Sequence, residues 1–151
     1  HLAGLLIGKY YRAKELGLEL IFDPACFVDR LPTALSHNEW ISIVGNLLDN
    51  AYNASLRQPQ GSRQIECLIN SDGHEVIIEI ADQGCGIDEA LRDRIFERGV
   101  TSSASKDHGI GLWLVRSYVE QAGGSIVVEN NIPFGTIFTL YIPLTRDEHH
   151  G

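Results

Sequence analysis

Three asparagines share one narrow side of a segment that has the pattern of a helix. Asn46, Asn50 and Asn53 follow one another at spacings of four and three residues, so a helix brings their amide groups together. A face that only meets solvent favours Glu, Lys and Gln, whereas Asn is a poor helix former. An amide oxygen suits Mg²⁺, which keeps waters and phosphate oxygens as its other ligands. On spacing alone, the three amides could equally belong to a solvated face.

The helix that carries these asparagines has the clearest boundaries in the sequence. Ser36 and Glu39 form an S-x-x-E capping box at its start, and Pro59 and Gly61 end it near Gln58. At about 100° per residue, the side opposite the asparagines is broad and apolar. Its members are Trp40, Ile41, Ile43, Val44, Leu47, Leu48, Ala51 and Ala54. We expect this side to be buried.

A carboxylate followed by two glycines offers a second kind of chemistry. Asp82 ends an alternating strand and is followed by Gly84 and Gly86. Glycine allows positive φ angles and a close approach of the backbone to a ligand. The carboxylate can accept a hydrogen bond from an amine, such as the N6 group of adenine. Taken alone, a D-x-G-x-G stretch is more often a turn than a binding site.

Gly109 and Gly111 stand directly before an apolar run that predicts a helix ending at Ala122. Glycine weakens a helix by roughly 1 kcal/mol relative to alanine, so bare backbone has a purpose there. Free N–H groups and the positive end of the helix dipole favour phosphate, and the alternative is tight packing against a neighbouring element. The stretch is not a Rossmann fingerprint, because Leu114 stands where the third glycine would be, and the chain has no G-K-[ST] of a P-loop.

The remaining pattern predicts the elements that must position these groups. Residues 2–15 favour a helix, and the small polar stretch 97–109 is expected to be a mobile loop after a short helix at 88–96. Strands are predicted at 17–22, 64–70, 75–82, 125–130 and 135–144, where the second and third form a hairpin. This order of elements predicts a mixed sheet with helices on one face, an α/β sandwich.

The composition is that of one globular domain. The chain has 151 residues, of which 44% are apolar and 21% charged, and its net charge of −8 argues against a nucleic acid as partner. No apolar run approaches the roughly 18 residues of a membrane span, and no signal peptide is expected. Cys26, Cys67 and Cys85 are odd in number and widely spaced, which argues against a disulfide framework and favours a reducing cytoplasm.

Four ordered segments resemble the sequence boxes of a known family. "NLLDNA" (46–51) resembles the N box, "DQGCGI" (82–87) the G1 box, "IFERGVTS" (95–102) the F box and "HGIGL" (108–112) the G2 box. The chain thereby resembles the catalytic and ATP-binding domain of sensor histidine kinases, and most closely the branch that senses citrate and C4-dicarboxylates. The resemblance implies the Bergerat fold: an α+β two-layer sandwich with a mixed, mainly antiparallel sheet and about three helices on one face.

The resemblance also implies a site for ATP and Mg²⁺. Asn46 and Asn50 would be the catalytic residues, with Asn50 as the metal ligand and Asn46 assisting the metal or the phosphates. Asp82 would bind the adenine amino group in a pocket shaped by Gly84 and Gly86. The other residues expected at the nucleotide are Asn53, Ile87, Phe96, Lys106, His108, Gly109, Ile110, Gly111, Leu112 and Thr136 of the late element "FGT".

One position departs from the pattern of the family. Asn53 stands where many members carry a basic residue, so phosphate neutralisation would fall to Arg57, Lys106 or His108. Residues 97–108 would form a lid over ATP, and Phe96 would pack at the hinge of this lid.

The resemblance divides the chain and implies its function. Residues 1–15 would be the tail of a preceding helical dimerisation domain or a linker, 16–146 the catalytic domain, and 147–151 a loose end. The catalytic domain would transfer the γ-phosphate of ATP to a histidine on the helical domain, which then phosphorylates a response regulator. His1 lacks an acidic neighbour and does not fit the acceptor. We expect this fragment to be a monomer and the whole protein a homodimer.

The whole protein would be a bacterial inner-membrane sensor, with this domain in the cytoplasm. A gyrase-type ATPase is disfavoured, because that chemistry needs a carboxylate to activate water and the group places Glu where this chain has Asn46. A serine kinase uses the same pocket, and only a substrate test separates it. Intact Asn50 and Asp82 argue against a fold that only docks a partner.

Overall fold

The structure is a computed structural model that describes residues 2–26, 31–58, 62–99 and 108–144. The elements in chain order are α1 (Leu2–Glu15), β1 (Glu19–Phe22), α2 (His37–Leu56), β2 (Gln64–Ser71), β3 (Glu75–Asp82), the 3-10 helix η1 (Arg92–Arg94), α3 (His108–Gln121), β4 (Ser125–Asn130) and β5 (Thr136–Pro143). None of the helices within these ranges combines the length and the apolar character of a membrane span.

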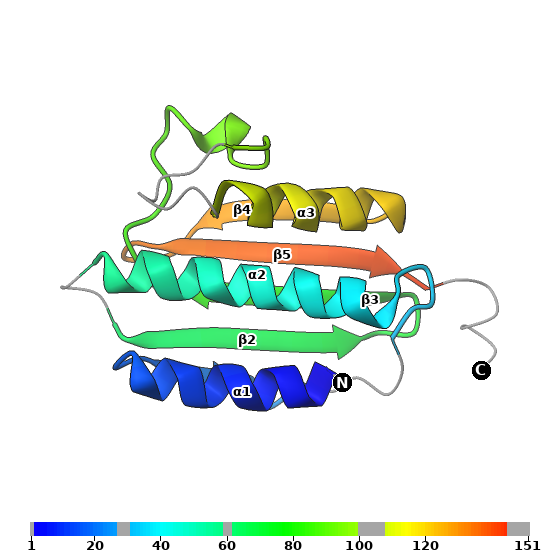
Figure 1. Cartoon of the computed structure of the whole chain (residues 1–151), viewed down its shortest axis with the longest axis horizontal. Coiled ribbons are helices and arrows are strands. Elements are labelled where there is room, and N and C mark those ends of the chain that lie inside the picture. The colour runs from blue at the N-terminus through cyan, green and yellow to red at the C-terminus, as the bar shows by residue number, and fades with distance from the viewer. Residues whose placement is uncertain (1, 27–30, 59–61, 100–107, 145–151) are drawn as a thin grey trace.

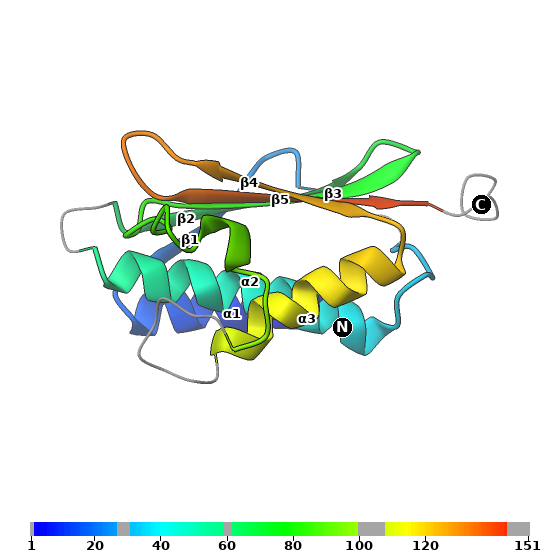
Figure 2. The same cartoon turned by 90° about the horizontal axis from the view of Figure 1, so that it is seen from above.

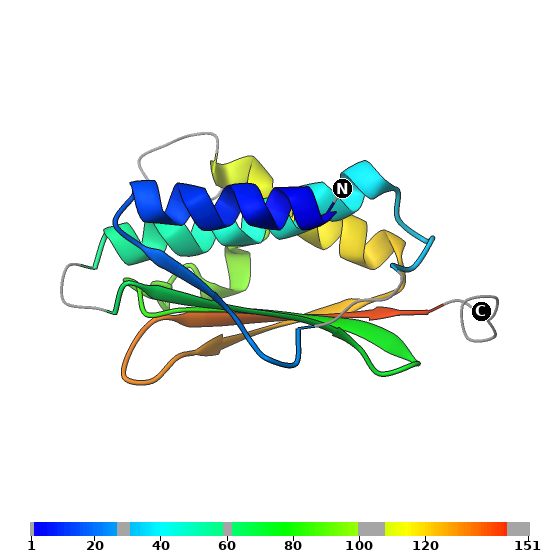
Figure 3. The same cartoon turned by 90° about the horizontal axis from the view of Figure 1, so that it is seen from below.

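The molecule has two layers, a sheet and a set of helices on one of its faces (Figure 2). The strand order is β1-β2-β3-β5-β4, with β1 parallel to β2 and the other neighbours antiparallel. The helix α2 lies between α1 and α3 (Figure 1), and no helix of the described chain covers the opposite face of the sheet (Figure 3). The predicted two-layer sandwich with a mixed, mainly antiparallel sheet is confirmed.

The core lies between the two layers and follows directly from the residue pattern. Alternate side chains of a strand point to opposite faces, so every second residue of the central strands faces the helices. Those residues are Ile65, Cys67, Ile69, Val76, Ile78, Ile80, Phe138, Leu140 and Ile142, and all are at most 1% exposed. The apolar side of α2 covers them as predicted, although Ile41 and Ala54 are only half-buried.

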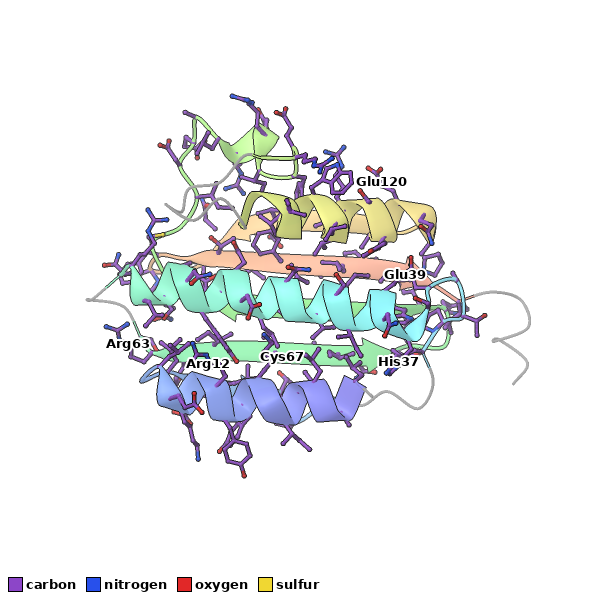
Figure 4. All side chains as sticks on the ribbon, viewed as in Figure 1. Arg12, His37, Glu39, Arg63, Cys67 and Glu120 are labelled. Atoms are coloured by element: carbon purple, nitrogen blue, oxygen red, sulfur yellow. The ribbon has the colours of Figure 1, made fainter. Side chains whose placement is uncertain are left out.

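The boundaries of α2 follow the sequence signals closely. The Ser36 hydroxyl accepts a hydrogen bond from the backbone N–H of Glu39 at 3.1 Å, and a carboxylate oxygen of Glu39 accepts one from the N–H of Ser36 at 2.8 Å. This capping box fixes the start of the helix near the position labelled Glu39 in Figure 4. The helix ends at Leu56, two residues before the predicted end at Gln58.

The short helix predicted at 88–96 is confirmed only in part, because this range contains the 3-10 helix η1 and no α-helix. The segment consists of turns around η1, and the Asp88 carboxylate accepts a bond from the N–H two residues on, which competes with helical hydrogen bonding. Arg92 then reaches across to β4, where its guanidinium donates to the Asn130 side chain and to the Val128 carbonyl, both at 2.8 Å. The segment is therefore held by turn hydrogen bonds of its own and by the contact of Arg92 with the edge strand β4.

The helix α3 ends as the glycine pair predicts. Gly123 has a φ of +77°, and its N–H and that of Gly124 donate to the carbonyls of Glu120 and Val119. This is the usual closure of a helix by a left-handed glycine. Because α3 starts at His108, the loop predicted at 97–109 ends before that residue.

The three cysteines are free thiols. Cys67 lies in the middle of β2, as Figure 4 shows, and its burial raises the pKa of the thiol to about 12.

Candidate functional site

Asp82 is a buried carboxylate at the end of β3. Asp82 is 1% exposed, and it lies opposite Thr136 in the register of β3 and β5. Burial raises the pKa of Asp82 to about 6, while hydrogen bonds from the backbone N–H groups of Gly84 and Thr136 act in the opposite direction. The bond from Gly84 to the carboxylate is 2.8 Å long. Asp82 is therefore a fixed acceptor held in a place with little water.

The glycine loop after Asp82 lies directly on the last turn of α2. A Cβ atom on Gly84 would stand 2.4 Å from the carbonyl carbon of Ala54 and 2.7 Å from the nitrogen of Ser55. The N–H of Cys85 donates to the Ala54 carbonyl at 3.1 Å. Gly86 has a φ of +73°, which side chains disfavour. Only glycine at position 84 lets the loop approach the helix this closely.

The hairpin between β4 and β5 closes over the backbone of Asp82. Gly135 has a φ of +110°, and a Cβ atom there would stand 2.1 Å from the Asp82 carbonyl oxygen. The same oxygen accepts a hydrogen bond from the side-chain amide of Asn131 at 2.8 Å. Thr136, predicted near the adenine end, lies opposite Asp82, whereas Asn131 carries no specific signal in the sequence.

The first turn of α3 packs on the middle of α2. A Cβ atom on Gly111 would stand 2.7 Å from the amide oxygen and 3.2 Å from the amide carbon of Asn46. The amide nitrogen of Asn46 donates to the carbonyl and the hydroxyl of Ser42, at 2.7 and 3.1 Å. The amide oxygen of Asn46 is therefore directed toward the start of α3, and Gly111 leaves room for it.

Asn50 and Asn53 lie further along the same side of α2, and both are half-buried. Asn50 is the ligand predicted for Mg²⁺, since an amide oxygen is a hard ligand, and Asn53 is predicted at the nucleotide. The neighbouring carboxylate, Asp49, makes an ion pair with Lys9 at 2.5 Å. The residues present therefore fit a metal held through an amide and through the phosphates of a ligand.

The helix α2 connects these two parts of the site. Gly84 touches it at Ala54 and Gly111 touches it at Asn46, eight residues earlier. At 1.5 Å per residue, about 12 Å of helix separates the two contacts. The loop after the buried carboxylate and the start of α3 therefore contact the same helix at two places about 12 Å apart.

The other predicted site residues differ in their packing and exposure. Phe96 packs edge-on against Phe138 with ring centres 6.2 Å apart, and the Arg116 guanidinium lies 6.0 Å from the Phe96 ring. Ile87 and Leu112 pack on the core, whereas Ile110 is 40% exposed. His108 and Gly109 form the first turn of α3, Arg57 caps α2, and Lys106 lies outside the described residues.

The comparison with known families agrees with this geometry. Residues 37–146 match the model of the histidine kinase-, DNA gyrase B- and HSP90-like ATPases. The chain belongs to this family, which confirms the resemblance carried by the four boxes.

Individual relatives are sensor kinases. The chain is 99% identical over 151 residues to the sensor histidine kinase CitA of Klebsiella pneumoniae, an alignment that covers 100% of this chain and 28% of that protein. It is 51% identical over 146 residues to the sensor histidine kinase DpiB of Escherichia coli K12, covering 95% of this chain and 26% of that protein. The chain thus spans little more than a quarter of the length of these relatives.

Solved structures share the fold. Full-length ShkA in complex with AMPPNP aligns with a TM-score of 0.71 at 26% identity, over 96% of this chain and 30% of that one. The catalytic domain of the histidine kinase ThkA aligns with a TM-score of 0.73 at 22% identity, over 97% of this chain and 95% of that one.

Proposed function

We propose that this chain binds Mg²⁺–ATP along α2 and presents the γ-phosphate to a histidine on a separate helical domain. The observation that carries the proposal is the contact of α2 with both glycine loops, Gly84 on Ala54 and Gly111 on Asn46. These contacts set the buried carboxylate of Asp82 and the start of α3 at the two ends of one site. Membership of the ATPase family and the AMPPNP complex of the similar ShkA support the same ligand.

Asp82 is suited to the adenine end. Its carboxylate already accepts hydrogen bonds from two backbone N–H groups and keeps further acceptor capacity for an exocyclic amine. The tight hairpin at Gly135 and the contact of Gly84 with α2 leave this carboxylate little freedom to move. A rigid, buried acceptor selects for a base with a donor at that point.

The start of α3 is suited to the phosphate end. The backbone N–H groups of the first turn, which includes Gly109 and Gly111, have no partner within the helix and favour an anion. The amide oxygen of Asn46 borders this turn, and Asn50 would hold Mg²⁺. When bound, the ion would neutralise charge on the phosphate oxygens.

The arrangement favours phosphotransfer over hydrolysis. Hydrolysis needs a base that activates water. Among the described residues of α2 the carboxylates are Glu39, which is engaged in the capping box, and Asp49, which is paired with Lys9. Attack by an imidazole depends mainly on positioning and on charge stabilisation, so this domain can act without a base of its own.

The context of the domain follows from its relatives. We infer that residues 1–15 continue a helical dimerisation domain that carries the acceptor histidine, and that 16–146 form the catalytic domain. The whole protein would be a homodimeric, membrane-bound bacterial sensor whose phosphohistidine serves a response regulator, with this domain on the cytoplasmic side. Its relatives named as sensor histidine kinases support this assignment.

Calorimetric titration with AMPPNP, in Mg²⁺ and in EDTA, tests the proposal. We expect micromolar-range binding that weakens at least tenfold in Asp82→Asn, and a gain on adding Mg²⁺ that is lost in Asn50→Ala. Asp93→Asn is a matched control, because Asp93 is exposed on η1. Transfer of labelled phosphate from ATP to a separately made acceptor-histidine domain, with little release of free phosphate, would complete the case. Absence of nucleotide binding would refute it.

A further inference from the structure

Two polar contacts join α1 to α2 at a single residue of α1. The ammonium group of Lys9 makes an ion pair with Asp49 at 2.5 Å, and the Lys9 carbonyl accepts a hydrogen bond from the hydroxyl of Tyr52 at 2.8 Å. We call these contacts of Lys9, Asp49 and Tyr52 the α1–α2 clasp. Asp49 and Tyr52 follow Lys9 in the sequence by 40 and 43 residues.

The clasp is partly sheltered from solvent. The side chain of Lys9 is 19% exposed and Tyr52 is 2% exposed, whereas the side chain of Asp49 is 51% exposed. The Tyr52 hydroxyl donates its hydrogen bond to the Lys9 carbonyl from its buried position. An ion pair with one partly buried partner is screened less than one in open solvent.

The position of the clasp on α2 gives it a consequence for the site. Asp49 and Tyr52 lie three residues apart, so they fall within one turn of the helix, and both contact α1. Asn50 lies between them in sequence and belongs to the same turn. The clasp joins α1 to this turn of α2. A shift of α1 along α2 therefore acts directly on the turn that carries the expected metal ligand.

Apolar packing alone does not fix this register. Leu5 and Ala13 of α1 pack on the core, and a Cβ atom on Gly45 of α2 would stand 3.9 Å from Leu5, an ordinary contact distance. Apolar contacts are non-directional and tolerate small slides, whereas hydrogen bonds and ion pairs of this length depend on geometry. A metal site requires its ligands to be held within about 0.5 Å.

We propose that Lys9 is a positioning residue for the Mg²⁺–nucleotide site, because the α1–α2 clasp fixes the turn of α2 that bears Asn50. The inference rests on the proposed function, since it assumes that Asn50 holds the metal. It assigns to α1 a part in the site beyond covering the core.

The test compares AMPPNP affinity with and without Mg²⁺ in variants of the clasp. Lys9→Met and Asp49→Asn both remove the ion pair but change the local charge in opposite directions. Tyr52→Phe removes only the hydroxyl. Arg12→Met is the matched control, because it removes the same charge from Arg12, labelled on α1 in Figure 4, whose partner within the described residues is Glu15 of its own helix.

We expect Lys9→Met, Asp49→Asn and Tyr52→Phe each to reduce the gain in affinity on adding Mg²⁺ by about threefold to tenfold. Removal of a residue that contacts a metal ligand directly has a somewhat larger effect on metal affinity. The affinity in EDTA and the value for Arg12→Met should stay unchanged.

Three results would overturn the proposal. An unchanged gain with Mg²⁺ in all three variants would leave the clasp a purely structural contact. Opposite effects of Lys9→Met and Asp49→Asn would assign the change to local charge rather than to position. An equal loss of affinity in EDTA would indicate general destabilisation. In each of these cases the unaltered chain still binds Mg²⁺–AMPPNP, whereas absence of that binding would refute the proposed function itself.

Discussion

The amide oxygen of Asn46 lies 2.7 Å from the point where a Cβ atom on Gly111 would stand. This contact explains why α3 begins with a residue that weakens helices. The bare backbone of Gly111 admits the Asn46 side chain from α2, so tight packing against a neighbouring element, one of the two explanations open from the sequence, applies at this position. Binding of a phosphate at the first turn of α3, the other explanation, stays a prediction, and the two do not exclude each other.

Gly111→Ala should separate stability from binding. Alanine favours a helix by up to about 1 kcal/mol over glycine, and the clash falls on the end of a side chain that can move. We expect the free energy of unfolding to change by less than about 1 kcal/mol, while the displaced amide of Asn46 lowers AMPPNP affinity about tenfold. Urea unfolding and calorimetry measure the two effects.

Gly8→Ala is the control for this prediction. Gly8 lies in α1 with nothing within 4 Å of an added Cβ atom. It should raise the free energy of unfolding by about 0.5–1 kcal/mol without changing the affinity. Equal affinity of Gly111→Ala and the unaltered chain would contradict the role given to the contact between Gly111 and Asn46.

Gly84→Ala should act on folding itself. The added Cβ atom would stand 2.4 Å from the backbone of Ala54, and backbone cannot swing aside as a side chain does. We expect the free energy of unfolding to fall by about 1–3 kcal/mol, the usual cost of overpacking. Urea unfolding at constant pH measures it, and a stability equal to that of the unaltered chain would show that the loop after β3 moves freely away from α2.

Local signals account for much of the fold. The capping box of Ser36 and Glu39 fixed the start of α2, and strict alternation identified β2 and β3, because one face of each strand is buried against the helices. The spacing of the asparagines on α2 and the glycines after Asp82 predicts a site on one side of that helix and at the end of that strand, and this stays a prediction. These features depend on residues that are neighbours in sequence.

Other features depend on contacts between distant segments, which no local pattern encodes. The segment 88–96 has helical residues, yet the pairing of Arg92 with β4 and the turn at Asp88 hold it in another shape. The bond from Asn131 to the Asp82 carbonyl and the clasp at Lys9 both arise only once the layers have packed. Their donors look like ordinary surface residues in the sequence.

Asp82→Asn should stabilise the chain at neutral pH. The pKa of Asp82 rises from 3.8 to about 6 on folding because of burial, so the folded chain holds this proton more tightly between about pH 4 and pH 6. Stability from this group is therefore present at low pH and is lost as the pH rises through that window, by roughly 3 kcal/mol. Asparagine carries no charge but offers one acceptor oxygen fewer, so we expect a net gain of about 1–2 kcal/mol at pH 7.5.

Urea unfolding at several pH values isolates this effect. Other groups also titrate, but they are common to both proteins, so the difference in unfolding free energy between Asp82→Asn and the unaltered chain reports on Asp82. The difference should grow from pH 4 to about pH 6.5 and then stay level. A difference that does not depend on pH would show that the buried carboxylate has an ordinary pKa in the folded chain.

Discrimination between ATP and GTP should depend on the same carboxylate. Adenine offers an amine to Asp82, whereas guanine places a carbonyl oxygen there, which would face a buried acceptor without a proton between them. We expect GTP to bind at least about 100-fold more weakly than ATP at pH 7.5. In Asp82→Asn the side-chain amide can donate to that oxygen, so the ratio should fall to about tenfold or less. Competition titrations against AMPPNP measure both ratios, and Asp93→Asn, whose exposed carboxylate lies on η1, should keep the ratio of the unaltered chain. Equal affinities for the two nucleotides in the unaltered chain would show that the base binds somewhere other than at Asp82.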